Sequence, residues 1–171
     1  MKHPAIASIL VVALAGLASG PASAQMPKYG VTTTADKGTD FSKIKTYTWE
    51  HGWQAPDKQV HEMITAAIER ELAALGLQKK ASGPADVLVT YASLRRIDVD
   101  LKSKPTDGDA GRRQYDVGSL VVLLLDPGSR KELYRARIDQ PIDVERDKVQ
   151  GIVDTAVTEM FQKYPTKAGK K

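Results

Sequence analysis

Arginine is the residue type in this sequence best placed to bind a charged ligand. It occurs in three close pairs: Arg95 with Arg96, Arg112 with Arg113, and Arg135 with Arg137. A guanidinium group can hold a carboxylate or a phosphate through two parallel hydrogen bonds. Arg135 and Arg137 share one face of a predicted strand, so pairing of that strand near Arg95 would create a basic patch for an anionic ligand. The alternative is a solvated sheet surface on which nearby acids neutralise the arginines, namely Asp98, Asp100 and Asp139.

Aromatic residues form a second candidate cluster, made of Tyr47, Trp49 and Trp53. Aromatic side chains around a loop can line a ligand pocket or anchor an interface, but where a strand meets a helix they more often belong to the core. Trp53 follows His51 and Gly52 in a loop, so we expect it to be the most exposed of the three. The candidate binding residues are therefore Arg95, Arg96, Arg135, Arg137 and Trp53.

Residue types that support common catalytic and metal sites are absent or unsuitably spaced. The chain has no Cys, which excludes thiolate catalysis, disulfides and cysteine-ligated metals. His51 and His61 do not form an HExxH motif, and a catalytic zinc usually needs three convergent protein ligands. Ser119 lacks the G-x-S-x-G pattern of a nucleophile elbow, and no glycine-rich phosphate loop occurs. We therefore predict no catalytic residue, no metal site and no cofactor.

The elements that position these residues are predicted to form an α+β domain. Alternating or β-branched stretches indicate strands over residues 29–35, 46–50, 77–79, 86–101, 115–126 and 133–138. Apolar residues at steps of three and four predict two long amphipathic helices, one from Asp57 to Gly76 and one from Val149 to Pro165. These elements give a two-layer or three-layer sandwich with a mixed or mainly antiparallel sheet of about five to six strands. Residues 117–125 are apolar at both parities, which predicts a central strand covered on both faces, and residues 102–114 are predicted to be a long hairpin loop.

Residues 1–24 have the pattern of a secretory signal peptide. Lys2 precedes an apolar run, and Ala22, Ser23 and Ala24 are the small residues typical of a cleavage site. Cleavage after Ala24 would export the remaining chain to the periplasm or cell envelope. The apolar run is shorter than the about 20 residues that a transmembrane helix needs, and without Cys no lipid anchor is expected. We predict one domain over residues 25–165 and a basic disordered tail over residues 166–171.

Five blocks of this sequence resemble the bacterial domain of unknown function (DUF) 4136 family, whose members are typically small exported proteins or lipoproteins. The blocks are residues 40–49, 84–91, 118–122 with Asp126, 133–135 and 160–165, of which the first, DFSKIKTYTW, is the most specific. Many members have Trp where this chain has Tyr134, Gly where it has Ala136, and a lipidated Cys that is missing here. The resemblance implies an exported α+β domain in the bacterial envelope and transfers no catalytic residue.

The export signal, the missing catalytic motifs and the family resemblance together favour a binding role. The chain has 25 Lys and Arg against 21 Asp and Glu, for a net charge of +4, and the charges are interleaved rather than gathered in the stripe typical of nucleic-acid binding. We therefore expect no nucleic-acid partner. The favoured interpretation is a noncatalytic module that binds a protein or an anionic or apolar envelope component. The alternatives are a small hydrolytic or lipid-modifying periplasmic enzyme and a structural assembly factor with a homodimeric sheet edge.

Overall fold

One mixed sheet of six strands organises the protein. The computed structural model describes residues 29–100, 113–142 and 144–168. In chain order the strands are β1 (Gly30–Ala35), β2 (Thr46–Trp49), β3 (Gln78–Lys79), β4 (Val87–Val99), β5 (Gln114–Leu125) and β6 (Glu132–Pro141). Their order across the sheet is β1-β6-β5-β4-β2-β3. Each of β1, β6, β5 and β4 is antiparallel to the strand next to it in this order. β2 runs parallel to both of its neighbours, β4 and β3. The predicted α+β class with a mixed sheet is confirmed.

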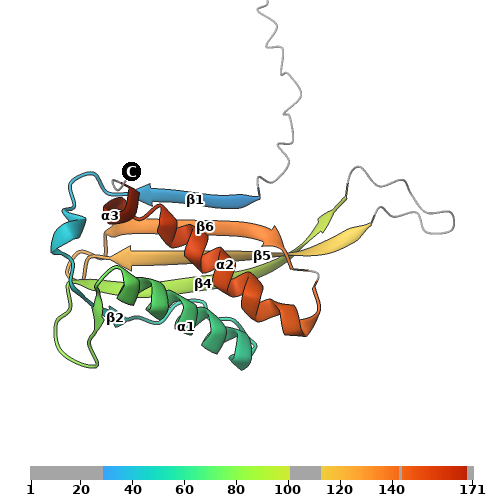
Figure 1. Ribbon diagram of the computed structural model, residues 1–171, viewed down its shortest axis with the longest axis horizontal. Helices are drawn as coiled ribbons and strands as arrows, with labels where there is room; N and C mark the ends of the chain where they lie inside the picture. Colours follow the sequence, from blue (N-terminus) through green and yellow to red (C-terminus); the bar gives the residue numbers. More distant parts are fainter. Residues whose placement is uncertain (1–28, 101–112, 143, 169–171) are drawn as a thin grey trace, which may run out of the picture.

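Both long helices, α1 (Lys58–Ala74) and α2 (Val149–Gln162), cover the same face of the sheet (Figure 1). Their N-terminal ends lie at the same end of the molecule, near the side from which β4 and β5 project beyond the helices. In the described part of the chain the other face of the sheet carries no helix. Over the described residues the fold is therefore a two-layer sandwich, the first of the two predicted arrangements.

The strand predicted to be central is central, but only one of its faces is covered by helices. β5 lies between β4 and β6, and its residues Leu120, Val122 and Leu124 face the helix layer and belong to the core. On the opposite face Val117 is also fully buried. There Arg96, on β4, extends across β5 to contact Ser119 and Asp139. A long side chain thus covers part of the face on which the sequence predicted a second layer.

α1 begins and ends where its sequence predicts. The Asp57 carboxylate accepts hydrogen bonds from the backbone N–H groups of Gln59 and Val60, at 2.9 and 3.2 Å, which makes Asp57 the N-cap. Gly76 follows the last turn with a φ of +83°, a conformation that glycine adopts at little cost. Between these ends Ile64, Ile68 and their neighbours on one face are buried against the sheet. The helix is therefore fixed with one known face toward the sheet and a defined first turn.

The C-terminal tail differs from its prediction. Disorder was expected from Thr166, but Pro165–Ala168 forms a short helix, α3. The Lys167 backbone N–H donates to the Tyr164 carbonyl, and its Nζ lies 3.0 Å from the Glu71 carboxylate on α1. A specific partner on α1 therefore orders a basic residue that composition alone marks as solvated. Residues 1–24 and most of the predicted loop over 102–114 lie outside the described residues.

Candidate functional site

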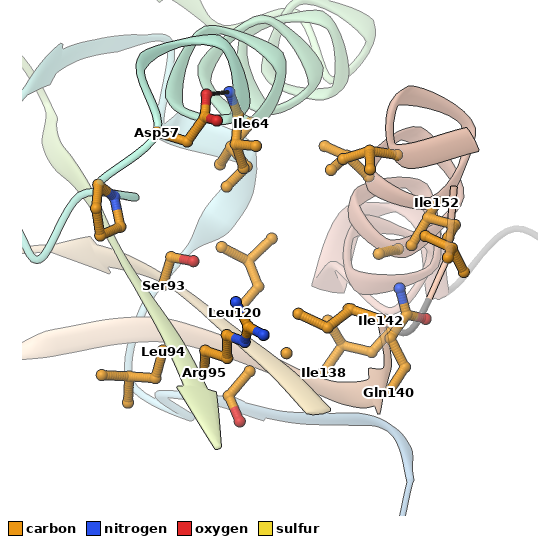
Figure 2. Close-up of a pocket in the computed structure, with 18 residues that line it drawn as sticks. Asp57, Ile64, Ser93, Leu94, Arg95, Leu120, Ile138, Gln140, Ile142 and Ile152 are labelled. Atoms are coloured by element: carbon orange, nitrogen blue, oxygen red, sulfur yellow. Dashed lines mark hydrogen bonds between the residues drawn. The ribbon is translucent and has the colours of Figure 1, made fainter. Parts of the chain in front are cut away.

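An apolar groove of about 500 Å³ lies between the first turns of α1 and α2 and the sheet beneath them. Figure 2 shows side chains from both helices and from β4, β5 and β6 around one space. Most of the lining is aliphatic, and its members include Val60, Ile64, Leu120, Ile138, Ile142, Val149, Ile152 and Val153. The volume is within the range of about 300–1,000 Å³ that small-molecule sites occupy.

Small residues leave this space open. Ala156 on α2, Gly118 on β5 and Ser93 on β4 all line the groove. A Cβ atom on Gly118 would lie only 2.8 Å from Cγ2 of Ile142, so the absence of a side chain at residue 118 lets Ile142 pack directly on the strand. A glycine inside a strand often marks such a close approach, and at residue 118 the approaching side chain is Ile142.

Polar groups are few and lie around the rim. Arg95 contacts Asp116 through two hydrogen bonds, 2.8 Å from Nε and 2.5 Å from Nη2. Across the helix N-termini, Nη2 of Arg146 lies 2.8 Å from the Asp57 carboxylate. Hydrogen bonds from the backbone N–H groups of Val60 and Gln59, together with the Arg146 guanidinium, outweigh burial and hold the pKa of Asp57 below its usual range. The groove is thus an apolar floor with a rim of paired charges.

Two uncharged polar side chains in the groove are free to meet a ligand. Within the described residues neither the Ser93 hydroxyl nor the Gln140 amide has a hydrogen-bond partner. Ser93, Arg95 and Gln140 come from β4 and β6, on either side of Gly118 in the register of the sheet. A small number of polar groups in an apolar pocket can orient a ligand that has one polar end.

Of the candidate arginines, only Arg95 lies beside the groove. Neighbouring residues of a strand point to opposite faces, so Arg96 lies on the other side of the sheet from Arg95. There Arg96 and Arg137 both bind Asp139, while Arg135 pairs with Glu132 at 3.2 Å. The strand that carries Arg135 and Arg137 pairs with β5 and β1, not with β4. Each of the four arginines therefore has a carboxylate partner, and they do not form one patch.

Asp139 is the centre of the polar network on the open face. It is 9% exposed and accepts hydrogen bonds from Ser119, Arg96 and Arg137. Burial alone would raise the pKa of Asp139, but hydrogen bonds from Arg137, Ser119 and Arg96 outweigh burial and hold the pKa far below its usual value. The network links β4, β5 and β6, which indicates a structural role.

The aromatic candidates separate into core and surface residues, as the sequence suggested. Tyr47 is buried, whereas Trp49 is half-buried and donates from Nε1 to Glu69 at 2.7 Å. Trp53 is 73% exposed and pairs through its backbone with Ala92 at the edge of β4. Trp53 is therefore available for a contact with a partner, although it is not part of the groove lining.

A second, more polar cavity of about 310 Å³ contains both described histidines. Nδ1 of His61 lies 2.5 Å from the Tyr91 hydroxyl, which also accepts from the Ala55 N–H at 3.2 Å. Burial raises the pKa of Tyr91, so the phenol keeps its proton and is not an activated nucleophile. Glu69 lines the same cavity but binds Trp49 and Lys79. Among the described residues neither histidine is hydrogen-bonded to a carboxylate, so no histidine–carboxylate pair of the kind found in many hydrolases occurs there.

Two general features of the described residues bear on function. Residues 29–100, 113–142 and 144–168 contain no cluster of three or more His, Asp or Glu side chains arranged to hold a metal ion. No helix within these ranges has the length and hydrophobicity needed to cross a bilayer.

Comparison with known protein families identifies the family of this chain. The model of a domain of unknown function, DUF4136, matches residues 31–166, so the chain belongs to this family, as the sequence blocks indicated. No curated protein matches the sequence.

Solved structures with a similar fold have low sequence identity to this chain. A PDZ domain protein from Parabacteroides distasonis matches 80% of this chain with a TM-score of 0.57 and 15% identity, and this chain covers 35% of that protein. The PelC dodecamer from Paraburkholderia phytofirmans matches 78% with a TM-score of 0.51 and 10% identity, and is covered over 94% of its chain. These similarities establish the shared fold.

Apart from Arg95, the groove-lining residues are functional candidates that sequence reasoning missed. Ile142 and Val144 lie between β6 and α2, in a segment to which no pattern assigned a role. Gly118 did carry a signal, because a glycine in an apolar strand indicates a close approach of another element. The residue that packs against Gly118, Ile142, is determined by the tertiary fold and could not be read from the sequence.

Proposed function

We propose that this protein is a noncatalytic module of the bacterial envelope that binds a small ligand with an apolar body in the groove between α1, α2 and the sheet. The observation that carries the proposal is the groove itself, an open aliphatic space of about 500 Å³. Burial of apolar ligand surface there would supply the binding free energy at about 25 cal/mol per Å² before the costs of association. The arrangement offers a binding surface and no paired nucleophile and base among the described residues.

The polar groups at the rim support a ligand with one polar end. Ser93 and Gln140 supply a hydroxyl and an amide, and Arg95 adds a cation whose charge Asp116 partly balances. A carboxylate or ester group attached to an alkyl chain fits this combination, because its oxygens accept from all three side chains. Such amphiphiles are normal components of a bacterial envelope, where the sequence pattern of residues 1–24 would deliver the protein.

The other candidate residues take different roles in this proposal. Arg96, Arg135 and Arg137 lie on the face opposite the groove, where carboxylates bind them. An anionic partner would have to displace those carboxylates, so we assign these arginines to the structure of the sheet. Trp53, exposed beside β4, is the candidate for contact with an envelope protein.

A fluorescence titration tests the proposed site. The purified exported chain is titrated with a dansyl-labelled fatty acid, and we expect saturable enhancement of dansyl emission at one site per chain. Unlabelled fatty acids should displace the probe. Replacement Ile142→Asp places a carboxylate in the groove and should weaken binding of the probe at least tenfold, because the charge would have to be desolvated or would repel the acid.

A matched variant separates the groove from general surface binding. Ile97 is 65% exposed on β4, outside the groove lining, and Ile97→Asp should leave the affinity for the probe unchanged. Equal loss of binding in both variants would point to nonspecific adsorption. Unsaturable binding by the unmodified chain would overturn the proposal.

A further inference from the structure

The two edges of the sheet are protected to very different degrees. β3, at one edge, has two residues, one of which is Lys79. β1, at the other edge, has six residues with the sequence GVTTTA, and it contains no charge and no proline. Short length, charge, proline and bulges are the usual means of preventing edge-to-edge pairing, and β1 has none of them within its own sequence. The β1 edge is therefore suited to pair with another strand.

The backbone groups that β1 presents outward can be identified from its pairing with β6. The Asp36 N–H donates to the Leu133 carbonyl, so the even-numbered residues of β1 bond to β6 and the odd-numbered ones point away. The outward groups belong to Val31, Thr33 and Ala35. In the described residues one partner is present for them, Nζ of Lys163, which donates to the Val31 carbonyl at 3.1 Å. Both backbone groups of Thr33 remain available.

We propose that β1 pairs with β1 of a second copy of this chain, antiparallel about a two-fold axis at Thr33, to form one continuous sheet through both copies. This inference is independent of the ligand groove. The outward residues, 31, 33 and 35, are symmetric about Thr33, so each copy would offer donors and acceptors at the positions that the other needs. An interface of this kind is isologous, the commonest symmetry of protein dimers.

The side chains that this register brings together are compatible on both faces. Thr33 would lie opposite its symmetry mate, Thr32 opposite Thr34, and Val31 opposite Ala35. Cross-strand threonine pairs are favourable, and no like charges meet within the strand. An axis at Thr32 or Thr34 would also pair outward groups, but only the axis at Thr33 pairs all three outward residues of β1 with one another within the strand.

The helix layer supplies complementary charge for a second copy. Lys163 reaches the outer carbonyl of β1, which places this side of α2 along the edge. Glu159 lies one turn earlier on the same side and is exposed, as is Lys163. About the proposed axis the two α2 helices run antiparallel, so Glu159 of one copy faces Lys163 of the other. This charge pattern favours a second copy over an unrelated strand.

A single cysteine tests the proposed axis, because the chain has no Cys of its own. Thr33→Cys places two thiols across the two-fold axis at a separation that a disulfide can span, so mild oxidation should give a covalent dimer. Thr32→Cys, one residue away, is the matched control and should crosslink poorly, because its own symmetry mate is displaced along the strand. Equal crosslinking of the two variants would overturn the register.

Sedimentation velocity tests the interface without a crosslink. The unmodified chain should show a concentration-dependent dimer, and Thr33→Pro should be monomeric because it removes an outward N–H that the fold of one copy does not use. Thr33→Val keeps that N–H and should dimerise normally. Glu159→Lys and Lys163→Glu should each weaken the dimer, and the double exchange should restore it. A chain that stays monomeric at its highest soluble concentration, or a dimer that survives Thr33→Pro, overturns the proposal.

Discussion

The two ends of the helix layer are packed in opposite ways. At the C-terminal end of α2 four aromatic residues meet, with ring centres 5.3 Å apart for Phe41 and Tyr164 and 5.0 Å apart for Tyr134 and Tyr164, and with Phe161 beside them. The Tyr134 hydroxyl also donates to the Met160 carbonyl at 2.7 Å. At the N-terminal end the same two layers enclose the groove, lined by aliphatic and small side chains.

This difference follows the side chains and the short segments that fill each end. The packed end receives Phe41 from the turn Phe41–Lys43 and adjoins α3, whereas the groove end is lined by aliphatic and small side chains without such a segment. The polar contacts between the helices also differ between the two ends, being buried at the aromatic end and exposed at the groove end. Glu71 binds Thr158 at 2.8 Å and Lys167 at 3.0 Å near the aromatic end, whereas the exposed pair of Asp57 and Arg146 connects the helices at the groove end. A firmly packed end can hold the helices apart at the other.

The largest expected effect comes from removing an aromatic ring at the packed end. Phe161 is fully buried, so Phe161→Ala should lower the free energy of unfolding by about 3–5 kcal/mol through lost burial and a new cavity. Ile152→Ala, on the same helix at the groove, should cost about 1 kcal/mol, because its side chain already faces open space. Urea denaturation followed by circular dichroism measures both. Similar losses would show that the groove is closed in solution and that the contrast between the ends is absent.

The sequence predicted the individual helices and their buried faces better than it predicted how the two helices pack on the sheet. Asp57 and Gly76 marked both ends of α1, and the apolar steps marked the buried face of each helix, because caps and periodicity are local properties. The choice of one face for both helices was not predictable, since it depends on which sheet surface each apolar stripe finds. The α3 helix was missed because Lys167 is fixed by Glu71, a residue distant in sequence.

The candidate site was predicted only in part, for a similar reason. Spacing placed Arg135 and Arg137 on one face, but it carries no information about the strand beside them, and β5 separates them from β4. The groove is built from five elements, and apart from Arg95 and Gly118 none of its residues stands out in the sequence. Trp53 was expected to be exposed from its loop context, and it is.

A smaller effect is expected from the polar link at the packed end. Burial opposes ionisation of Glu71, but hydrogen bonds from Thr158 and Lys167 outweigh it and hold the pKa below its usual value of 4.5. A lowered pKa in the folded state stabilises the protein above that usual value, and this contribution is lost as the pH falls through the folded-state pKa. Glu71→Gln should therefore cost about 1–3 kcal/mol at neutral pH.

Unfolding free energies measured across a series of pH values test whether the ionised carboxylate of Glu71 is the source of this stability. The difference between the original chain and Glu71→Gln should shrink as the pH is lowered into the acidic range. Glu62→Gln is the control, because Glu62 is exposed on the same helix and pairs with Lys58 in solvent. A difference that stays constant with pH would mean that shape, and not charge, is what Glu71 contributes.

The smallest effect on stability, and the most direct test of the open end, is expected from Gly118→Ala. The added Cβ would approach Cγ2 of Ile142 to 2.8 Å, so the Ile142 side chain must shift into the groove. Stability should fall by about 1 kcal/mol, the low end of overpacking costs, because Cγ2 branches from the β-carbon of Ile142 and can move only with χ1, while the backbone at residue 118 has no positive φ. Binding of the dansyl fatty acid should nevertheless weaken several-fold as the groove narrows. Gly128→Ala, in the turn between β5 and β6, makes ordinary contact with its surroundings and should alter neither property. Unchanged probe affinity in Gly118→Ala would place the ligand elsewhere, because no small substitution narrows this end of the helix layer more directly.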